Sequence, residues 1–148
     1  MSTQLRSGDL QIVVFDPSDR EAVVDLWRRC DLTRPWNNPY ADLDTTLSSP
    51  ASTLLVARIG ESLAGTVMVG FDGHRGWVYY LGVEPKHRRL GVGRRLMEEA
   101  EAWLRERGAS KIQLMVRDTN AAAIGFYERL GMERQRVVTI GKRLDGNA

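Results

Sequence analysis

Val83-Glu84-Pro85-Lys86-His87-Arg88-Arg89-Leu90-Gly91-Val92-Gly93 is the stretch that decides the fold, because it separates two segments of different periodicity. The residues before it, Trp77 to Val83, have the apolar and aromatic composition of a strand. After it, apolar residues recur at helical spacing from Gly91 to Arg107, and Gly108 is a typical helix end. The stretch is therefore predicted to turn a strand into a long helix.

The chemistry of this turn favours phosphate. The first turn of a helix has unpaired N–H groups and a partial positive charge. Gly91 and Gly93 let an anion approach the backbone without Cβ atoms in the way. Four guanidinium groups suited to phosphate oxygens flank the glycines: Arg88, Arg89, Arg94 and Arg95. The alternative is a tight turn with a solvated basic face.

A dinucleotide site is the natural rival for a glycine-rich strand-to-helix turn. That site requires Gly-x-Gly-x-x-Gly, but Leu96 occupies the third position. Asp118, after the next predicted strand, can imitate the ribose-binding acid. The turn nevertheless follows three runs of antiparallel character and opens no βαβ repeat, so the nicotinamide hypothesis is disfavoured.

The composition limits the number of domains and the kinds of partner that this chain is expected to have. The chain has 148 residues, of which 43% are hydrophobic and 27% charged, with a net charge of +2. These values fit one globular domain over residues 1–148, with residues 1–8 expected to be a flexible N-terminus. Neither nucleic acid nor a membrane is an expected partner. Cys30 is the single cysteine, which fits the cytoplasm. It lies on the apolar stripe of its predicted helix, so it is expected to pack in the core rather than act as a nucleophile.

The remaining segments predict an α/β (α+β) fold: a mixed, mostly antiparallel sheet with helices on both faces. The expected order is β-α-α-β-β-β-α-β-α-β-β. Ser18 and Glu21 are expected to form a capping box for the first helix. The strands are expected at 10–15, 53–59, 63–71, 77–83, 111–116 and, once or twice, within 133–144; the helices at 18–30, 40–47, 91–107 and 120–130.

Asn120 and Tyr127 form a second motif, because seven residues place them on one face of a helix, two turns apart. Alone they are typical of an N-cap and a core tyrosine. Combined, Val83-x-Pro85-x-x-Arg88-x-x-Gly91-x-Gly93 and Asn120-x-x-Ala123-x-x-Phe126-Tyr127-x-x-x-Gly131 resemble the GNAT family of N-acetyltransferases.

Further segments resemble the bacterial YpeA-like subgroup of this family and extend from the first helix to the last strand. They are Leu26-Trp27-x-Arg29-Cys30-Asp31-Leu32-x-Arg34-Pro35-Trp36-Asn37, Gly65-Thr66-Val67-Met68, Asp72-Gly73-His74-Arg75-Gly76, Tyr79-Tyr80-Leu81-Gly82-Val83 and Gly141-Lys142-Arg143-Leu144.

The resemblance implies a sheet of six to seven strands in which 77–83 splays from 111–116, with acetyl-CoA as cosubstrate between them. It implies that Gly82 permits a bulge, that the Val83 N–H polarises the thioester carbonyl, that Asn120 binds the pantetheine arm and that Tyr127 protonates the thiolate. The implied cofactor-binding residues are Leu81, Gly82, Val83, Arg88, Arg89, Leu90, Gly91, Val92, Gly93, Arg94, Asn120 and Tyr127. No metal is expected, because His74 and His87 have no second ligand at suitable spacing.

The proton acceptor for the amine is left open by the sequence. An alkyl ammonium has a pKa of about 10, so a group or a water chain must remove its proton. Many GNAT members carry a glutamate on the strand that here reads Trp77-Val78-Tyr79-Tyr80-Leu81, which has no carboxylate. The alternatives are Glu84, Asp72, His74, Asp118 and a water relay bounded by Tyr79 or Tyr80.

The acceptor is expected at the loop 31–40 and the turn 72–76, whose candidate contacts are Arg34, Trp36, His74, Arg75 and Tyr79. These can frame a small acceptor with an anionic group, or Trp36 simply fills the loop and the arginines are solvated. Small metabolites, peptide N-termini and protein lysines all remain open. Two other functions are alternatives to acetyl transfer: a non-catalytic CoA sensor, and a module whose basic turn binds an acidic partner. The final strands often pair in this fold, so a homodimer is a further expectation.

Overall fold

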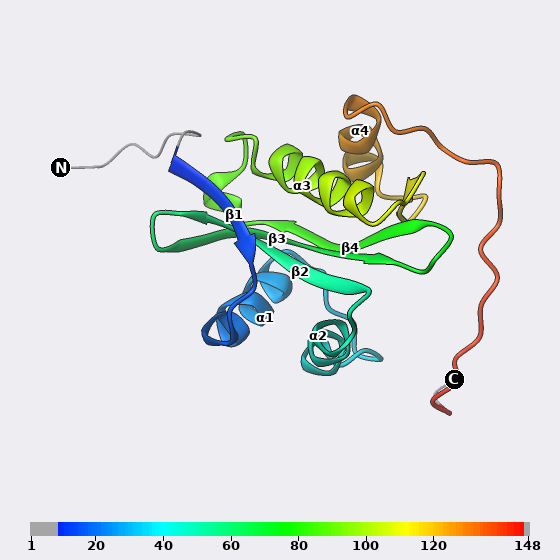
Figure 1. The fold of residues 1–148 in the computed structure, drawn as a ribbon, viewed down its shortest axis with the longest axis horizontal. Coiled ribbons are helices and arrows are strands. Elements are labelled where there is room, and N and C mark those ends of the chain that lie inside the picture. The colour runs from blue at the N-terminus through cyan, green and yellow to red at the C-terminus, as the bar shows by residue number, and fades with distance from the viewer. Residues whose placement is uncertain (1–8, 147–148) are drawn as a thin grey trace. The chain divides into compact units, whose positions relative to one another are not determined.

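The computed structural model describes residues 9–146, in which five strands form one sheet in the order β1-β2-β3-β4-β5 (Figure 1). The first four strands pair antiparallel, and β4 pairs with β5 in parallel. The elements are β1 (Leu10–Val14), α1 (Arg20–Arg29), α2 (Pro39–Ser48), β2 (Ser52–Ile59), β3 (Ser62–Phe71), β4 (Gly76–Val83), α3 (Val92–Glu106), β5 (Ile112–Gln113) and α4 (Ala121–Arg129), with short 3-10 turns η2 (Pro17–Asp19) and η3 (Pro85–His87).

Two compact units make up the chain, one ending at Leu114 and the other beginning at Met115. The first contains the whole sheet with α1, α2 and α3, and the second contains α4. The predicted flexible segment 1–8 lies outside the described residues. Over residues 9–146, no helix has both the length and the apolar character that crossing a membrane requires.

The sheet of the first unit is covered on both faces (Figure 1). α1 and α2 lie on one face, where Val23, Trp27, Leu43 and Leu54 are fully buried in one hydrophobic cluster. α3 lies on the other face and buries an apolar stripe at helical spacing, Val92, Leu96, Ala100 and Leu104. The predicted α/β fold with helices on both faces is therefore confirmed.

Two glycines let α3 approach the sheet closely. A Cβ on Gly65 would lie 3.0 Å from Leu96 Cδ1 and 2.7 Å from the carbonyl oxygen of Gly82. A Cβ on Gly76 would lie 2.4 Å from Leu104 Cδ1. The sequence therefore uses glycine where the helix has to sit directly on the strand backbone.

The predicted strand count was too high. Among the described residues the sheet has five strands rather than six to seven, and no strand forms within 133–144. The apolar residues that suggested a strand there, Val137, Val138 and Ile140, are 75%, 83% and 91% exposed. The predicted strand 111–116 is shortened to Ile112–Gln113. β-propensity describes a fit to a half-buried pleated surface, and these segments have no such surface to lie on.

The start of α1 also differs from the prediction. The capping box lies at Asp16 and Asp19 rather than at Ser18 and Glu21. The Asp16 carboxylate accepts from the Ser18 N–H at 2.9 Å, and the Asp19 carboxylate accepts from the Asp16 N–H at 3.1 Å. Pro17 presets the backbone for a helical first position, so the chain begins to coil two residues earlier than predicted.

Candidate functional site

The turn between β4 and α3 contains two residues with left-handed backbone, Gly91 and Arg89. Gly91 is the N-cap of α3 and has a φ of +77°. Arg89 has a φ of +78°, although left-handed backbone is costly for a residue with a Cβ. Such strain costs about 1–3 kcal/mol and concentrates at ligand-binding turns. Backbone strain of this kind is therefore expected of a turn that binds a ligand.

Three amides at the start of α3 precede its hydrogen-bond ladder. The Arg95 N–H donates to the Gly91 carbonyl at 3.0 Å, which is the first bond of the helix. The N–H groups of Val92, Gly93 and Arg94 come before that bond. They form the positive end of a 15-residue helix, which is an anion-binding position.

The arginines of this turn carry charge that the rest of the described chain does not neutralise. Arg88, Arg89 and Arg94 are exposed, Arg95 is half-buried, and none pairs with an acid in residues 9–146. Arg29 on α1, in contrast, pairs with Glu84. The turn is thus a concentration of unpaired positive charge around free backbone amides.

Cys30 lies beside this turn. Its thiol is half-buried and donates to the Val83 carbonyl at 3.4 Å. Burial raises the pKa of the Cys30 thiol, and the nearby Arg88 only partly opposes that effect. A thiol that stays protonated packs as a small apolar group rather than attacking as a thiolate.

β4 contains a bulge, but Gly82 is not the residue that forms it. Thr66 pairs with Gly82 and Met68 with Tyr79, so Tyr80 and Leu81 together face one residue of β3. Tyr80 takes the left-handed conformation, with a φ of +52°. Gly82 has another purpose, because a Cβ there would lie 2.9 Å from Leu32 Cδ1. The predicted role of Gly82 is therefore corrected to close packing against the α1–α2 segment.

A buried polar network holds the bulge in place. The Thr66 hydroxyl donates to the Tyr80 carbonyl at 2.9 Å, and it accepts from the Trp27 indole N–H at 2.9 Å. The Tyr80 ring stacks on Trp27, with centroids 3.9 Å apart and planes 16° apart. Sequence analysis missed Thr66, whose one signal is a hydroxyl within an apolar strand. The network fixes both the carbonyl and the side chain of the bulged residue.

Beyond the bulge, β4 has a free edge. Within the part of the chain that the structure describes, β4 pairs with β5 only at Gly76–Ile112 and Trp77–Gln113, so the predicted splay of these strands is confirmed. The Glu84 N–H donates to the Ala64 carbonyl at 2.8 Å, which makes Ala64 and Glu84 a hydrogen-bonded pair. Pair types alternate along an antiparallel ladder, so Val83 and Gly65 form a non-hydrogen-bonded pair. The Val83 N–H consequently points to the free edge.

The structure gives two of the candidate proton acceptors other partners. The Asp72 carboxylate accepts from the N–H groups of Arg75 and His74, both at 2.7 Å, and from the Trp77 indole at 3.1 Å. These bonds, the one from Arg75 first, lower the pKa of Asp72. Glu84 is paired with Arg29. The other two candidates, His74 and Asp118, are exposed.

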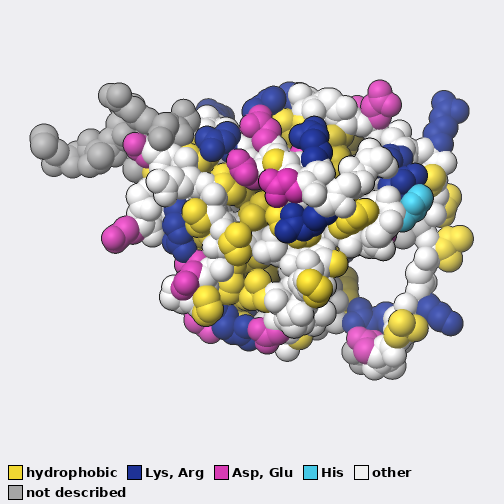
Figure 2. Space-filling view, in the orientation of Figure 1, with side chains coloured by type: hydrophobic (Ala, Val, Ile, Leu, Met, Phe, Trp, Pro, Cys, Tyr) yellow, Lys and Arg dark blue, Asp and Glu magenta, His cyan; other side chains and the backbone are white. Residues whose placement is uncertain are grey.

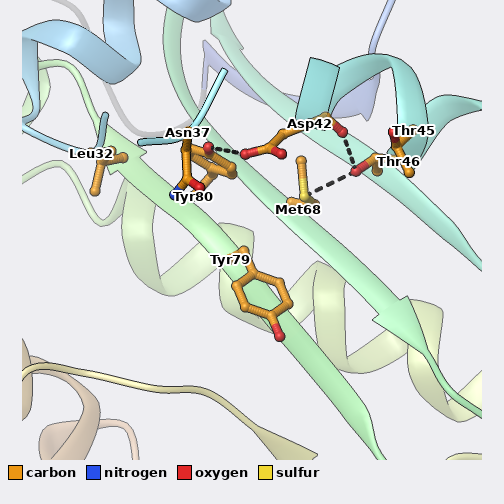
Figure 3. Close-up of a pocket in the computed structure, with 8 residues that line it drawn as sticks. All are labelled: Leu32, Asn37, Asp42, Thr45, Thr46, Met68, Tyr79 and Tyr80. Carbon is orange, nitrogen blue, oxygen red and sulfur yellow. Dashed lines mark hydrogen bonds between the residues drawn. The ribbon is translucent and has the colours of Figure 1, made fainter. Parts of the chain in front are cut away.

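A cavity of about 500 Å³ lies on the α1–α2 face of the sheet (Figure 3). Its lining comes from the loop after α1 (Leu32 and Asn37), from α2 (Asp42, Thr45 and Thr46) and from the strands (Met68, Tyr79 and Tyr80). Of the predicted acceptor contacts, Tyr79 lines this cavity, and Arg34, Trp36, His74 and Arg75 do not. Arg34 donates instead to the carbonyls of Thr33 and Asp31.

The second unit contains Asn120 and Tyr127. The Asn120 side chain caps α4 by accepting from the Ala123 N–H at 3.1 Å. Tyr127 is half-buried and meets Phe126 edge to face, with ring centroids 5.0 Å apart. Burial raises the pKa of Tyr127 to about 12. Within residues 9–146, no group of three or more His, Cys, Asp or Glu side chains is arranged to hold a metal ion.

Comparison with known proteins adds a family to this geometry. The model of the acetyltransferase (GNAT) family matches residues 20–132. An acetyltransferase of Pectobacterium atrosepticum is 47% identical over 135 residues, which cover 91% of this chain and 96% of that protein.

Solved structures share the fold at low sequence identity. AAC(6')-Iy in complex with the bisubstrate analogue CoA-S-monomethyl-acetylneamine superposes with a TM-score of 0.77 at 18% identity, covering 90% of this chain and 98% of that one. Glucosamine-6-phosphate N-acetyltransferase of Arabidopsis thaliana superposes with a TM-score of 0.72 at 18% identity, covering 92% and 99%. By its match to the family model and to a close relative, the chain belongs to the GNAT family of acetyltransferases.

Proposed function

We propose that this protein is an N-acetyltransferase that transfers acetyl from acetyl-CoA to a primary amine by direct attack in a ternary complex. The observation that carries the proposal is the free edge of β4. The Val83 N–H on this edge has no strand partner among residues 9–146, and the strand leads directly into the turn that contains the arginines. One continuous segment thus offers an amide for a thioester carbonyl and a helix N-terminus for phosphate.

The residues present fit CoA. The amides of Val92, Gly93 and Arg94, with the guanidinium groups of Arg88 and Arg89, suit the pyrophosphate. The strand edge at Leu81 to Val83 suits the amide groups of the pantetheine arm, and the family motif assigns Asn120 to the same arm. The CoA analogue in the AAC(6')-Iy complex supports this use of the fold. The family model crosses both compact units, so we assign the whole chain to one catalytic domain.

When bound, acetyl-CoA supplies an acetyl thioester whose C–S bond breaks as the new C–N bond forms. Val83 is proposed to donate its N–H to the carbonyl oxygen, where negative charge develops. Tyr127 is proposed to hold the proton that the departing sulfur takes. Its raised pKa, about 12, keeps this phenol protonated at neutral pH, as the role requires.

The amine must lose a proton before it attacks. Asp72 and Glu84 are already held by hydrogen bonds and by an ion pair, which disfavours both as bases. We propose a water relay beside Tyr79 and Tyr80, where the strand edge meets the cavity. Tyr79 is 46% exposed, so water reaches this part of β4. His74 and Asp118 remain the alternatives.

The acceptor is proposed to be a small-molecule amine that enters through the cavity below Tyr79 and Tyr80. Several proteins of the same fold are named for such acceptors, namely aminoglycosides and glucosamine 6-phosphate. A peptide amine is the second choice, since Tyr79, which lines the cavity, is 46% exposed.

An amine screen that follows release of the CoA thiol tests this proposal. We expect release from acetyl-CoA that depends on the added amine. The absence of a carboxylate on β4 favours a second candidate, a non-catalytic sensor of CoA or acetyl-CoA. Saturable acetyl-CoA binding without thiol release across a broad amine panel would establish the sensor and reject the enzyme.

A further inference from the structure

The acids around the α1–α2 face differ in their partners. Asp44 pairs with Arg20 and Asp19 pairs with Arg58. Asp42, on the first turns of α2, has no cationic partner among residues 9–146. It is also the one charged residue that lines the cavity described above. A carboxylate in a hollow without a compensating cation is a site where an added cation gains binding energy.

Tyr80 holds this carboxylate in one position. The Tyr80 hydroxyl donates to Asp42 Oδ2 at 2.6 Å (Figure 3). Burial, and then this bond to Asp42, raise the pKa of Tyr80, so the phenol keeps the proton that it donates to the carboxylate. The stacking of Tyr80 on Trp27 fixes the ring that carries the hydroxyl. Asp42 Oδ1 accepts no hydrogen bond from residues 9–146 and is available to a ligand.

The cavity connects this charge to the reactive strand. Tyr80 is the bulged residue of β4, so Asp42 lies one tyrosine side chain away from the free edge that ends at Val83. Leu32 and Met68 supply apolar lining between polar groups, which suits a methylene chain. Asn37 and Thr45 add uncharged polar groups, and no lysine or arginine lines the space.

We propose that this cavity binds a diamine acceptor, with Asp42 holding the ammonium that does not react while the other nitrogen faces the β4 edge. The inference rests on the proposed acetyl transfer. It adds the class of the acceptor, a diamine, and the residue that selects it, Asp42. It replaces the expectation of an anionic acceptor, because the charge that lines the cavity is negative.

A matched pair of probes tests the proposal in turnover. 1,4-Diaminobutane has the second ammonium, and 4-aminobutan-1-ol replaces it with a hydroxyl at the same chain length. The wild-type protein should prefer the diamine about tenfold or more in kcat/KM, the range of a charge-assisted hydrogen bond. Asp42→Asn should raise KM for the diamine by a similar factor and bring kcat/KM for the two probes close together.

Two further variants separate this role from a structural one. Asp44→Asn removes a carboxylate from the same helix outside the cavity and should leave the preference intact. Tyr80→Phe keeps the Asp42 carboxylate but removes the hydroxyl that positions it, so it should reduce the preference less than Asp42→Asn does. Equal kcat/KM for both probes in the wild-type protein overturns the proposal without any variant.

Calorimetric titration of 1,4-diaminobutane into protein saturated with CoA provides a readout without turnover. Binding that exceeds that of the amino alcohol about tenfold, and that falls to the level of the amino alcohol in Asp42→Asn, supports the proposal. Equal binding of the two probes rejects it. If thiol release occurs but shows no diamine preference, the inference fails and the acetyltransferase proposal stands. If acetyl-CoA does not bind, the acetyltransferase proposal fails, and titration of the diamine into the free protein still decides the inference.

Discussion

At the scale of a residue, the burial of Tyr127 suits its proposed role as proton donor. Its half-buried ring and raised pKa keep a proton on the phenol. We expect Tyr127→Phe to lower kcat by about tenfold or more, with little change in the KM for acetyl-CoA, because general acid catalysis is lost while the ring remains. Tyr40→Phe, which removes a hydroxyl bonded to Glu21 on the α1–α2 face, is the matched control. Unchanged turnover in Tyr127→Phe would show that the proton comes from elsewhere.

The pH dependence of kcat follows from the same group. A raised pKa means that the acid form persists well above neutral pH and is lost only as the pH approaches about 12. We therefore expect kcat to rise with pH through about pH 10 as the amine deprotonates, with no decline from loss of the Tyr127 proton over that range. A steady-state profile with saturating substrates measures this. A decline that begins near pH 8 and disappears in Tyr127→Phe would contradict the assigned pKa.

The roles of single residues could be predicted less completely than the helices and strands. Gly91 is predicted from the sequence as a place where an anion can approach the backbone, and the structure adds a left-handed φ at the α3 N-cap that glycine permits. Arg89 shares that conformation without any signal in its residue type. Gly82 was assigned to the bulge, which the structure places at Tyr80. Asp42 was missed because its partner, Tyr80, lies far along the chain and only the fold brings them together.

At the scale of elements, the bulge in β4 depends on one hydroxyl. We expect Thr66→Val to destabilise the protein by about 1–3 kcal/mol, because it leaves the buried Trp27 indole N–H and the Tyr80 carbonyl without their partner. Urea unfolding measures the change. Thr45→Val, at an exposed position on α2, should change the stability by less than about 0.5 kcal/mol. Equal effects of both substitutions would show that the network does not hold the bulge.

Most elements of the first unit could be predicted because their periodicity agrees with their packing. α3 shows its apolar stripe in the sequence, and Gly65 and Gly76 admit that stripe to the sheet. The segment 133–144 has the residues of a strand, but its side chains are exposed in the described chain. Local pattern states that a segment can form a strand, and it does not state whether another strand pairs with it.

At the scale of the whole molecule, the exposed apolar residues of the C-terminal segment point to association. Single exposed apolar side chains are ordinary, but Val137, Val138 and Ile140 are consecutive or nearly so. We expect a homodimer in solution, and Val138→Asp with Ile140→Asp to shift it toward monomer. Analytical ultracentrifugation reads the mass of both proteins. A wild-type monomer at all concentrations would contradict this expectation.

The surface of the molecule carries charges of both signs. Figure 2 shows acidic and basic side chains interspersed on one face. Against this mixed background, the turn from Arg88 to Arg95 stands out because four arginines without acidic partners in residues 9–146 lie close together in the sequence around the start of α3. The proposed binding of acetyl-CoA therefore depends on that turn more than on any other part of the surface.

Isothermal titration of acetyl-CoA into the wild-type protein and into Gly91→Glu tests that dependence most directly. The substitution places a carboxylate, and a Cβ in a left-handed position, where phosphate is expected. Gly60→Glu is the matched control, since Gly60 has a φ of +62° in the β2–β3 turn and open space around it. We predict saturable binding to the wild-type protein and to Gly60→Glu, and binding at least about tenfold weaker to Gly91→Glu. No detectable binding of acetyl-CoA to the wild-type protein at millimolar concentration would contradict the account.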